Sequence, residues 1–327
     1  MNGNCATTVP GNVGENDQKF RAARFDWASL LGTATTGLSV LLIFLILLVI
    51  LGNVCIDGLP YVSWRFISTG TATDMFDVNK AGILPMIFGT SARVLLMTLF
   101  VLPVGVITAI YLTEYARMHS PFTRLIRGAV NNLAGVPSIV FGLFGAGFFV
   151  RFIGRGLDQA FHPAGAGVVW GQPALLWASA TLAVMTLPVV IVATEESLRA
   201  IPQGLREASL ALGASKLETI FKIVLPQAVP GIMTGAILAI SRAAGEVAPI
   251  LFTGAAYYMA DLPKSLHDQF MDLGYHVFIL STQSPDVEKT KPLLYATVLV
   301  LLVLTFALNL VAIFVRANMR KKLRMLQ

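Results

Sequence analysis

Two charged residues of opposite sign lie inside an otherwise apolar segment in the C-terminal third of the chain. Arg242 and Glu246 are four residues apart, so an α-helix would place both on the same face. Charge at membrane depth costs about 2.5–3.5 kcal/mol on insertion scales, so this face must avoid lipid. The planar guanidinium suits an oxyanion such as phosphate. We expect Arg242 to guide an anion and Glu246 to orient or gate it. The simpler alternative is an ion pair that locks two helices together.

Small residues accompany this charged pair along the same side of the predicted helix. At about 100° per residue, Gly231, Gly235 and Ala239 fall within the arc that also holds Arg242 and Glu246. Residues without bulky side chains allow a second helix to approach closely. We expect this side of the helix to pack against the rest of the protein or to line a water-filled cavity.

The composition of the whole chain indicates a membrane protein. Of its 327 residues, 55% are hydrophobic and only 13% are charged, whereas soluble domains average about 25% charged residues. Several uncharged stretches approach or exceed the roughly 20 residues needed to cross the hydrocarbon core. They are continuous rather than alternating, which indicates helices and excludes barrel strands. The predicted fold is an all-α integral membrane protein with six transmembrane helices at about 29–51, 90–113, 130–151, 173–194, 229–253 and 292–316.

Lysine and arginine residues predict the orientation of these helices. Most of them fall in segments that are cytoplasmic if the N-terminus lies inside, and fewer, among them Arg65, Lys80 and Arg93, fall outside. This asymmetry predicts a multi-pass protein of the bacterial inner membrane with both termini in the cytoplasm. Residues 1–25 are expected to be a flexible cytoplasmic tail and residues 26–327 the transmembrane domain. The first apolar stretch is too long for a signal peptide, so we expect it to remain as a helix.

The chain carries no motif of a nucleotide-hydrolysing or hydrolytic enzyme. It has no GxxxxGK[ST] phosphate-binding loop and no GxSxG motif. Its histidines are scattered without HExxH or other metal-ligand spacing. The net charge of +6 comes from basic residues in the gaps between apolar stretches, which does not suit nucleic-acid binding. We therefore predict no catalytic residue, no metal site and no cofactor bound by this chain itself.

The segment 195–228 is predicted to lie in the cytoplasm and to form two short amphipathic helices. Gly213 can adopt a positive φ and end the first helix. Ser215 can cap the second helix, with Glu218 completing a capping box, and Pro226 is expected to end it. So short a hairpin cannot bury its apolar faces alone. It therefore needs another surface, either a partner protein or the surface of the membrane.

This loop resembles the EAA loop of ABC importer permeases. The resemblance rests on Glu207-Ala208-Ser209, on Gly213, and on Ile223-Val224-Leu225-Pro226 at their spacing. Ser209 replaces the second alanine of the motif, one small residue for another. In that family the loop docks into a groove on a separate cytoplasmic ATPase, which would hold the ATP. The residues expected to couple to this ATPase are Glu207, Ala208, Gly213, Leu225 and Pro226.

Two further stretches narrow the resemblance to permeases of phosphate importers. Gly135–Leu143 (GVPSIVFGL) resembles the VPSIVFGL signature of those permeases, and Ser241–Thr253 (SRAAGEVAPILFT) resembles a run of the PstA family. Val247 replaces the usual threonine of the second stretch, which removes a hydroxyl but keeps the charged pair. Pro137 is expected to loosen the third helix. Pro137 and Ser138 either line the substrate pathway or serve only helix packing.

The resemblance covers roughly residues 88–316 and implies a type I ABC importer permease fold. It implies that this chain and a second, PstC-like permease form the translocation pathway, above a dimer of a PstB-like ATPase. A periplasmic or extracellular phosphate-binding protein would dock from outside, and phosphate would cross near Arg242 and Glu246. Three alternatives stay open. They are a permease of a sulfate or molybdate importer, the partner phosphate permease PstC, and a membrane scaffold or sensor in phosphate signalling.

Overall fold

The computed structural model describes residues 27–71, 76–77, 80–117, 120–161, 167–259 and 261–324. In these ranges the chain is helical apart from turns and loops, and an isolated bridge joins Ala255 to Phe270. Six helical segments of the described residues are long and apolar enough to cross a membrane. The predicted all-α fold with six membrane-spanning helices is confirmed. The tail predicted over 1–25 lies outside the described residues.

Several of the spans consist of an α-helix continued by a π-helical turn. The spans are α1 (Trp27–Gly58); α3 (Leu84–Ile110) with η2 (Tyr111–Tyr115); α5 (Ser138–Gly145) with η3 (Ala146–Gly154) and α6 (Arg155–Phe161); α7 (Leu175–Arg199); α9 (Lys216–Thr219) with η4 (Ile220–Val224) and α10 (Leu225–Gly245); and α12 (Val287–Arg324). The shorter elements are η1 (Leu59–Tyr61), α2 (Trp64–Ser68), α4 (Pro121–Ala134), α8 (Gln203–Ala211) and α11 (Leu273–Thr282). Of the described residues, those up to Gly52 form one unit and those from Asn53 a second, which holds the features described below.

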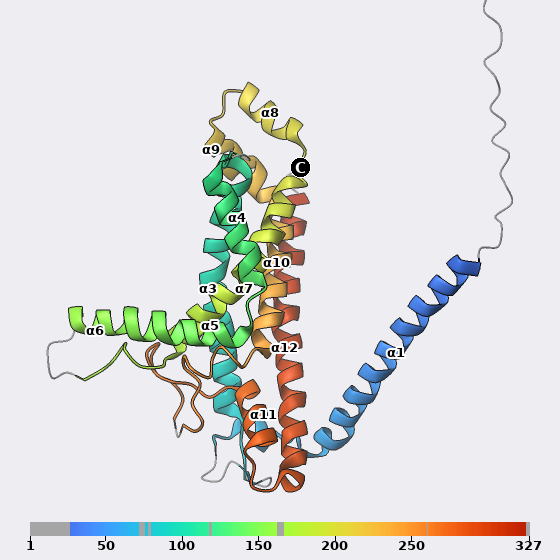
Figure 1. Ribbon diagram of the computed structural model, residues 1–327, viewed down its shortest axis with the longest axis vertical. Helices are drawn as coiled ribbons and strands as arrows, with labels where there is room; N and C mark the ends of the chain where they lie inside the picture. Colours follow the sequence, from blue (N-terminus) through green and yellow to red (C-terminus); the bar gives the residue numbers. More distant parts are fainter. Residues whose placement is uncertain are drawn as a thin grey trace, which may run out of the picture. The chain divides into compact units, whose positions relative to one another are not determined.

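Helix α7 lies at the centre of the second unit (Figure 1). It packs against α3, α10, α5 and α4, and it contributes Leu182, Met185 and Val190 to the main hydrophobic core. Gly235 of α10 approaches α7 so closely that an added Cβ would lie 2.8 Å from the Ala193 Cβ. The small residues of α10 therefore permit close helix packing, as the sequence predicts.

The third span differs from the single helix predicted over 130–151. Residues 121–134 form a separate amphipathic helix, α4, and the span itself begins at Ser138. Pro137 separates the two, because it has no backbone N–H and keeps the preceding residue out of helical geometry. Its own backbone is extended, with a ψ of 140°. Helix α5 and its continuation then project sideways from the bundle of α3, α7 and α10 (Figure 1).

Replacing Gly145 by alanine should lower the thermal stability of the protein. A Cβ at this position of α5 would collide with the Thr181 hydroxyl of α7 and lie 2.7 Å from the Thr253 Cγ2. Overpacking of this kind costs about 1–3 kcal/mol. Gly147→Ala is the matched control, because a Cβ there meets no atom of the described residues within 4 Å. Thermal unfolding of the purified protein in detergent measures both variants, and equal midpoints would contradict the tight contact at Gly145.

Helix α10 ends at Gly245 rather than at the predicted residue 253. Glu246 has an extended backbone, with φ −82° and ψ 125°, and residues 248–254 form turns. Pro249 has no N–H with which to continue the helical hydrogen bonds. The carbonyl oxygens of Ala243 and Ala244, in the last turn, accept hydrogen bonds from an arginine side chain of another helix.

The beginning of this span also differs, because Pro226 does not end a helix. Lys216–Gly245 is one continuous helical segment of 30 residues. A π-helical turn, Ile220–Val224, comes shortly before the proline. The wider turn leaves room for the proline ring, which would clash with the carbonyl one turn earlier in a regular α-helix. The second arm of the predicted hairpin and the charged end of α10 therefore belong to one helix.

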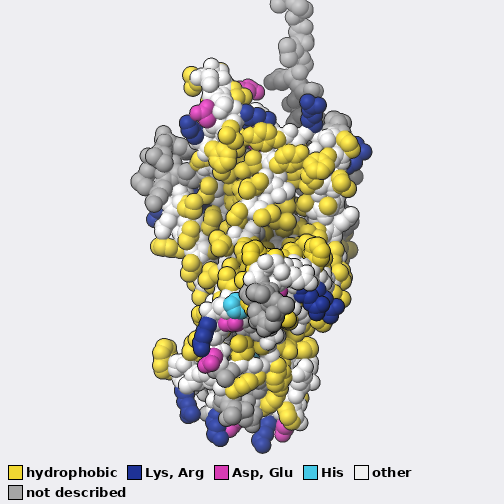
Figure 2. Space-filling model, turned by 90° about the vertical axis from the view of Figure 1, so that its left-hand side faces the viewer, with side chains coloured by type: hydrophobic (Ala, Val, Ile, Leu, Met, Phe, Trp, Pro, Cys, Tyr) yellow, Lys and Arg dark blue, Asp and Glu magenta, His cyan; other side chains and the backbone are white. Residues whose placement is uncertain are grey.

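Figure 2 shows hydrophobic side chains over most of the middle of one face, with charged side chains mainly above and below them. Large apolar side chains such as Leu99 of α3 and Phe314 of α12 are exposed. Exposed apolar surface of this extent is stable in lipid or against another apolar protein. The surface therefore agrees with a multi-pass protein of the inner membrane.

Candidate functional site

Arg242 and Glu246 lie together at the end of α10. The Arg242 Nε lies 3.5 Å from the Glu246 Oε1, and the two side chains expose 40% and 24% of their surfaces. An ion pair of this length between partly exposed groups is weak. Arg242 lies in the last turn of α10 and Glu246 directly follows that helix. Within this chain the pair therefore does not join two helices. Its groups are therefore accessible to an anion.

A polar contact places this pair beside the apolar stretch of α12. The Ser241 hydroxyl lies 2.8 Å from the Asn309 Oδ1 and donates a hydrogen bond to it. Asn309 lies well inside the span Val287–Lys321. Ser241, and with it Arg242, therefore lies beside the interior of this apolar span rather than at either of its ends. An exposed arginine in this position must face water or another protein.

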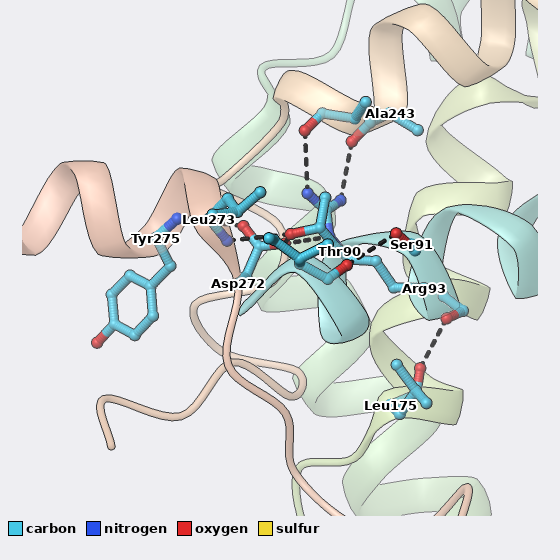
Figure 3. Close-up of polar contacts among 11 residues, drawn as sticks. Thr90, Ser91, Arg93, Leu175, Ala243, Asp272, Leu273 and Tyr275 are labelled. Atoms are coloured by element: carbon cyan, nitrogen blue, oxygen red, sulfur yellow. Dashed lines mark hydrogen bonds and ion pairs between the residues drawn. The ribbon is translucent and has the colours of Figure 1, made fainter. Parts of the chain in front are cut away.

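A buried arginine on α3 holds the end of α10 behind this pair (Figure 3). Arg93 and Asp272 form an ion pair of 2.6 Å, and both side chains are fully buried. The Arg93 guanidinium also donates to the Ala243 carbonyl at 2.8 Å and to the Ala244 carbonyl at 3.2 Å. These carbonyls belong to the last turn of the helix, where acceptors lack helical partners and the dipole favours a cation. Arg93 thus fixes the two residues that follow Arg242.

The sequence places Arg93 at the outer edge of its helix, whereas the structure buries it inside the protein. Helix α3 begins at Leu84, so Arg93 lies inside it. The uncharged run of this helix begins only after Arg93, but pairing with Asp272 lets the charge be buried in the protein. Pro85 is the signal in the sequence that marks the true start, because proline is favoured in a first helical turn.

The two stretches that resemble phosphate permeases pack against each other. A Cβ on Gly142 of α5 would lie 3.0 Å from the Ala248 carbonyl oxygen and 3.1 Å from the Pro249 Cα. Pro137, at the break before α5, is exposed, and Ser138 is half-buried. Non-helical backbone within a membrane is stable where protein covers it or where it lines a cavity. Interrupted helices of this kind form substrate sites in many transporters.

The charged side chains at the end of α10 have the chemistry to bind an anion. No three His, Cys, Asp or Glu side chains of the described part come together as possible metal ligands. The exposed charges at the end of α10 are one guanidinium and one carboxylate. The guanidinium can donate several hydrogen bonds to an oxyanion, and the carboxylate can only accept them while it is ionised.

At the far end of the same helix, the hairpin α8–α9 has the predicted turn. Gly213 has a φ of +87°, which favours glycine. The Ser215 hydroxyl accepts from the Glu218 backbone N–H at 3.2 Å, and the Glu218 carboxylate accepts from the Ser215 N–H at 3.0 Å. The predicted capping box is therefore confirmed. The Ser209 and Thr219 hydroxyls lie 2.9 Å apart, so the serine that replaces an alanine adds a bond between the two arms.

One side of the hairpin is attached to the end of the α3 span. Arg206 of α8 lies 2.9 Å from Glu114 of η2, and both side chains are largely buried. The same guanidinium donates to the Ile201 carbonyl at 2.7 Å and to the Leu198 carbonyl at 2.8 Å. Lys216 donates to the backbone carbonyl of Glu114. The sequence does not predict this ion pair, because Arg206 and Glu114 are far apart in the chain.

The hairpin also exposes apolar residues. Leu212, beside the turn, exposes 90% of its surface. Glu207, Ala208 and Gly213 are also exposed, whereas Leu225 and Pro226 lie half-buried where α10 begins. Exposed apolar side chains on so short a hairpin indicate a contact with another surface. The apolar side chains exposed here are Leu205, Leu210, Leu212, Leu217 and Phe221.

Comparison with known proteins identifies the family. Residues 101–325 match the family described as binding-protein-dependent transport system inner membrane component. The probable ABC transporter permease protein YqgI of Bacillus subtilis is 31% identical over 271 residues, which cover 79% of this chain and 85% of that protein. The chain belongs to this family of ABC importer permeases.

Relatives within the family also support the resemblance to PstA. The phosphate transport system permease protein PstA of Mycobacterium leprae is 38% identical over 52% of this chain and 50% of its own length. PstA 1 of Mycobacterium tuberculosis is 37% identical over 58% of this chain. The match thus spans about half the length of these mycobacterial permeases. The predicted resemblance of this chain to PstA is therefore confirmed.

Solved structures agree on the importer permease fold. A chain of a bacterial alginate ABC transporter aligns with a TM-score of 0.60 and 14% identity, over 90% of this chain and 95% of that chain. A chain of the MetNI methionine ABC transporter in an inward-facing conformation aligns with a TM-score of 0.51 and 18% identity, over 73% of this chain. At these identities the likeness shows the fold alone.

Proposed function

We propose that this chain is a permease subunit of an ATP-driven phosphate importer. The observation that carries the proposal is the exposed Arg242–Glu246 pair, which lies beside the apolar span of α12 on the stretch that resembles PstA. Relatives named as phosphate transport permeases support the same substrate, with 37–38% identity over 52–58% of the chain. A second permease would complete the pathway along this face.

The chemistry of the pair fits phosphate better than sulfate. The Arg242 guanidinium can offer two parallel N–H groups to two oxygens of an oxyanion. Glu246 lies beside it and, while ionised, can accept a hydrogen bond only from an oxygen that carries a proton. Hydrogen phosphate carries such a proton at neutral pH, whereas sulfate does not. A bound sulfate would therefore place its negative charge beside the Glu246 carboxylate, with no hydrogen bond between them to offset the repulsion.

The coupling of this site to ATP hydrolysis uses the hairpin α8–α9. The exposed side of the hairpin, with Glu207, Ala208, Gly213 and the apolar residues around Leu212, docks on a separate cytoplasmic ATPase. Its movement reaches the anion site through the uninterrupted helix Lys216–Gly245. The Arg206–Glu114 ion pair would carry the same movement to the α3 span.

The proposed function also implies which end of the protein faces the cytoplasm. The hairpin and the C-terminal end of α12 lie at the same end of the second unit (Figure 1), and both would face the cytoplasm. The N-terminal tail would lie on the same side. Helix α11 lies at the opposite end and would face outward, toward a phosphate-loaded binding protein. The complete assembly would hold this chain, a PstC-like permease and two copies of a PstB-like ATPase.

Uptake of labelled phosphate by proteoliposomes tests the proposal. The vesicles hold the complete complex with ATP inside, and the phosphate-binding protein of the same organism is added outside. Uptake should require both ATP and the binding protein, and unlabelled sulfate or molybdate in excess should not compete. Sulfate or molybdate uptake in place of phosphate would assign the chain to another oxyanion importer. Phosphate-dependent signalling in cells without any uptake would indicate a scaffold or sensor.

A further inference from the structure

A buried polar cluster of three residues, Thr90, Arg93 and Asp272, joins three elements of the second unit. The Arg93 Nε donates to the Asp272 Oδ2 at 2.6 Å, and the Thr90 hydroxyl donates to the same oxygen at 2.8 Å. Thr90 also accepts a hydrogen bond from the Leu273 backbone N–H at 3.0 Å. All three side chains are buried. None of them can touch a substrate at the exposed end of α10.

One side of this cluster determines where the charged pair lies. Arg93 reaches the carbonyl oxygens of Ala243 and Ala244, which lie between Arg242 and Glu246 in the chain. These two peptide groups connect the last helical residues to the extended backbone of Glu246. A shift of the guanidinium would therefore change how Arg242 and Glu246 are presented.

The other side of the cluster caps α11. The Asp272 Oδ1 accepts from the Tyr275 backbone N–H at 3.1 Å, which makes Asp272 the N-cap of that helix. Figure 3 shows Asp272 at the start of α11, next to Thr90 and Arg93. Helix α11 lies at the end of the second unit opposite the hairpin α8–α9 (Figure 1). One carboxylate thus connects this end of the unit to the end of α10.

We infer that Thr90, Arg93 and Asp272 are positioning residues that transmit contact at α11 to the anion site. This inference rests on the proposed function, in which α11 faces the binding protein. Movement of α11 displaces the Asp272 carboxylate, which draws the Arg93 guanidinium and the last turn of α10 with it. A packed, fully paired cluster transmits such a movement because it changes between discrete arrangements rather than deforming gradually.

The test compares two threonine-to-valine variants of α3 in the complete reconstituted complex. Thr90→Val removes both hydrogen bonds of the cluster that involve Thr90 and leaves the Arg93–Asp272 pair in place. Thr98→Val is the matched control, because among the described residues the Thr98 hydroxyl bonds only to the Val94 carbonyl of its own helix. ATP hydrolysis is measured without and with the phosphate-loaded binding protein, and phosphate uptake is measured in parallel.

Thr90→Val should keep the basal ATPase rate and lose stimulation by the binding protein by about fivefold or more, since coupling between sites typically amounts to about 5–150-fold. Thr98→Val should behave like the unsubstituted complex. Equal stimulation of the two variants would overturn the inference. So would a Thr90→Val complex that fails to assemble or loses basal and stimulated hydrolysis alike, because the cluster would then only hold the fold. Arg93→Lys, which keeps the charge but loses the fork, should reproduce the Thr90→Val result.

The unsubstituted complex separates failure of this inference from failure of the proposed function. If its ATPase is stimulated by the loaded binding protein and it takes up phosphate, the proposed function holds whatever the variants show. If it is stimulated by a binding protein loaded with another oxyanion, the substrate is wrong. The comparison of Thr90→Val with Thr98→Val is then repeated with that protein and still decides the role of the cluster.

Discussion

Arg242→Gln should reduce phosphate uptake by about tenfold to a hundredfold while the complex still assembles. A hydrogen bond to a charged group contributes about 1.5–3 kcal/mol, and the neutral amide of glutamine brings no positive charge to the anion. Arg242 is 40% exposed, and its contact with Glu246 is a long one of 3.5 Å. Its removal therefore leaves no buried charge unpaired. Labelled phosphate uptake into proteoliposomes, normalised to the amount of assembled complex, measures the loss.

Two further variants make this result specific. Arg320→Gln makes the same chemical change at an exposed position near the end of α12 and should leave uptake unchanged. Arg242→Lys keeps the charge but loses the planar fork, so its uptake should fall between those of the glutamine variant and the unsubstituted protein. Near-normal uptake by Arg242→Gln, with assembly verified, would exclude a role of Arg242 in transport.

Gly213→Val should reduce the amount of ATPase that co-purifies with the permease by about fivefold to thirtyfold. The φ of Gly213 is +87°, and left-handed backbone costs a residue with a Cβ about 1–2 kcal/mol. A β-branched residue is especially unfavourable there. The turn between α8 and α9 would have to rearrange, which displaces Glu207 and the exposed apolar side chains that would meet the ATPase. Quantitative co-purification from membranes that contain all subunits gives the measurement.

Gly204→Val provides the matched control. A Cβ at Gly204 or at Gly213 meets no atom of the described residues within 4 Å, and of these two glycines Gly213 alone has a positive φ. This variant should retain the ATPase. Gly213→Asn should recover much of the association, because asparagine tolerates left-handed backbone better than valine does. If both valine variants lose the ATPase equally, the added bulk and not the backbone conformation is responsible.

The hairpin is predictable from sequence because its signals are local. Gly213, Ser215 and Glu218 lie within six positions of one another, and each determines the backbone of its neighbours. The same holds for the break at Pro137, although the sequence alone did not show that residues 121–134 form a helix of their own. The composition of the chain is sufficient to predict the membrane-spanning character of the fold.

The arrangement behind the Arg242–Glu246 pair cannot be predicted from local sequence signals. Arg93 and Asp272 are far apart in the chain, and only the folded protein brings their side chains within 2.6 Å. From the sequence, each is a charge next to an apolar stretch, which normally marks the membrane surface. Tertiary pairing overrides that rule, because opposite charges can be buried together when their hydrogen bonds are satisfied. The continuity of the helix through Pro226 is missed for a related reason, because a π-helical turn leaves no simple sequence signal.

Because the helix from Lys216 to Gly245 is uninterrupted, the number of residues in it determines the direction in which Arg242 points. Each residue of a helix adds about 100° of rotation and about 1.5 Å of length. One residue inserted between Pro226 and Ser241 would therefore swing Arg242 by about 100° around the helix axis, away from its present direction, with every motif intact. The angular phase between the two ends of this helix is thus determined by the count of residues that separate them.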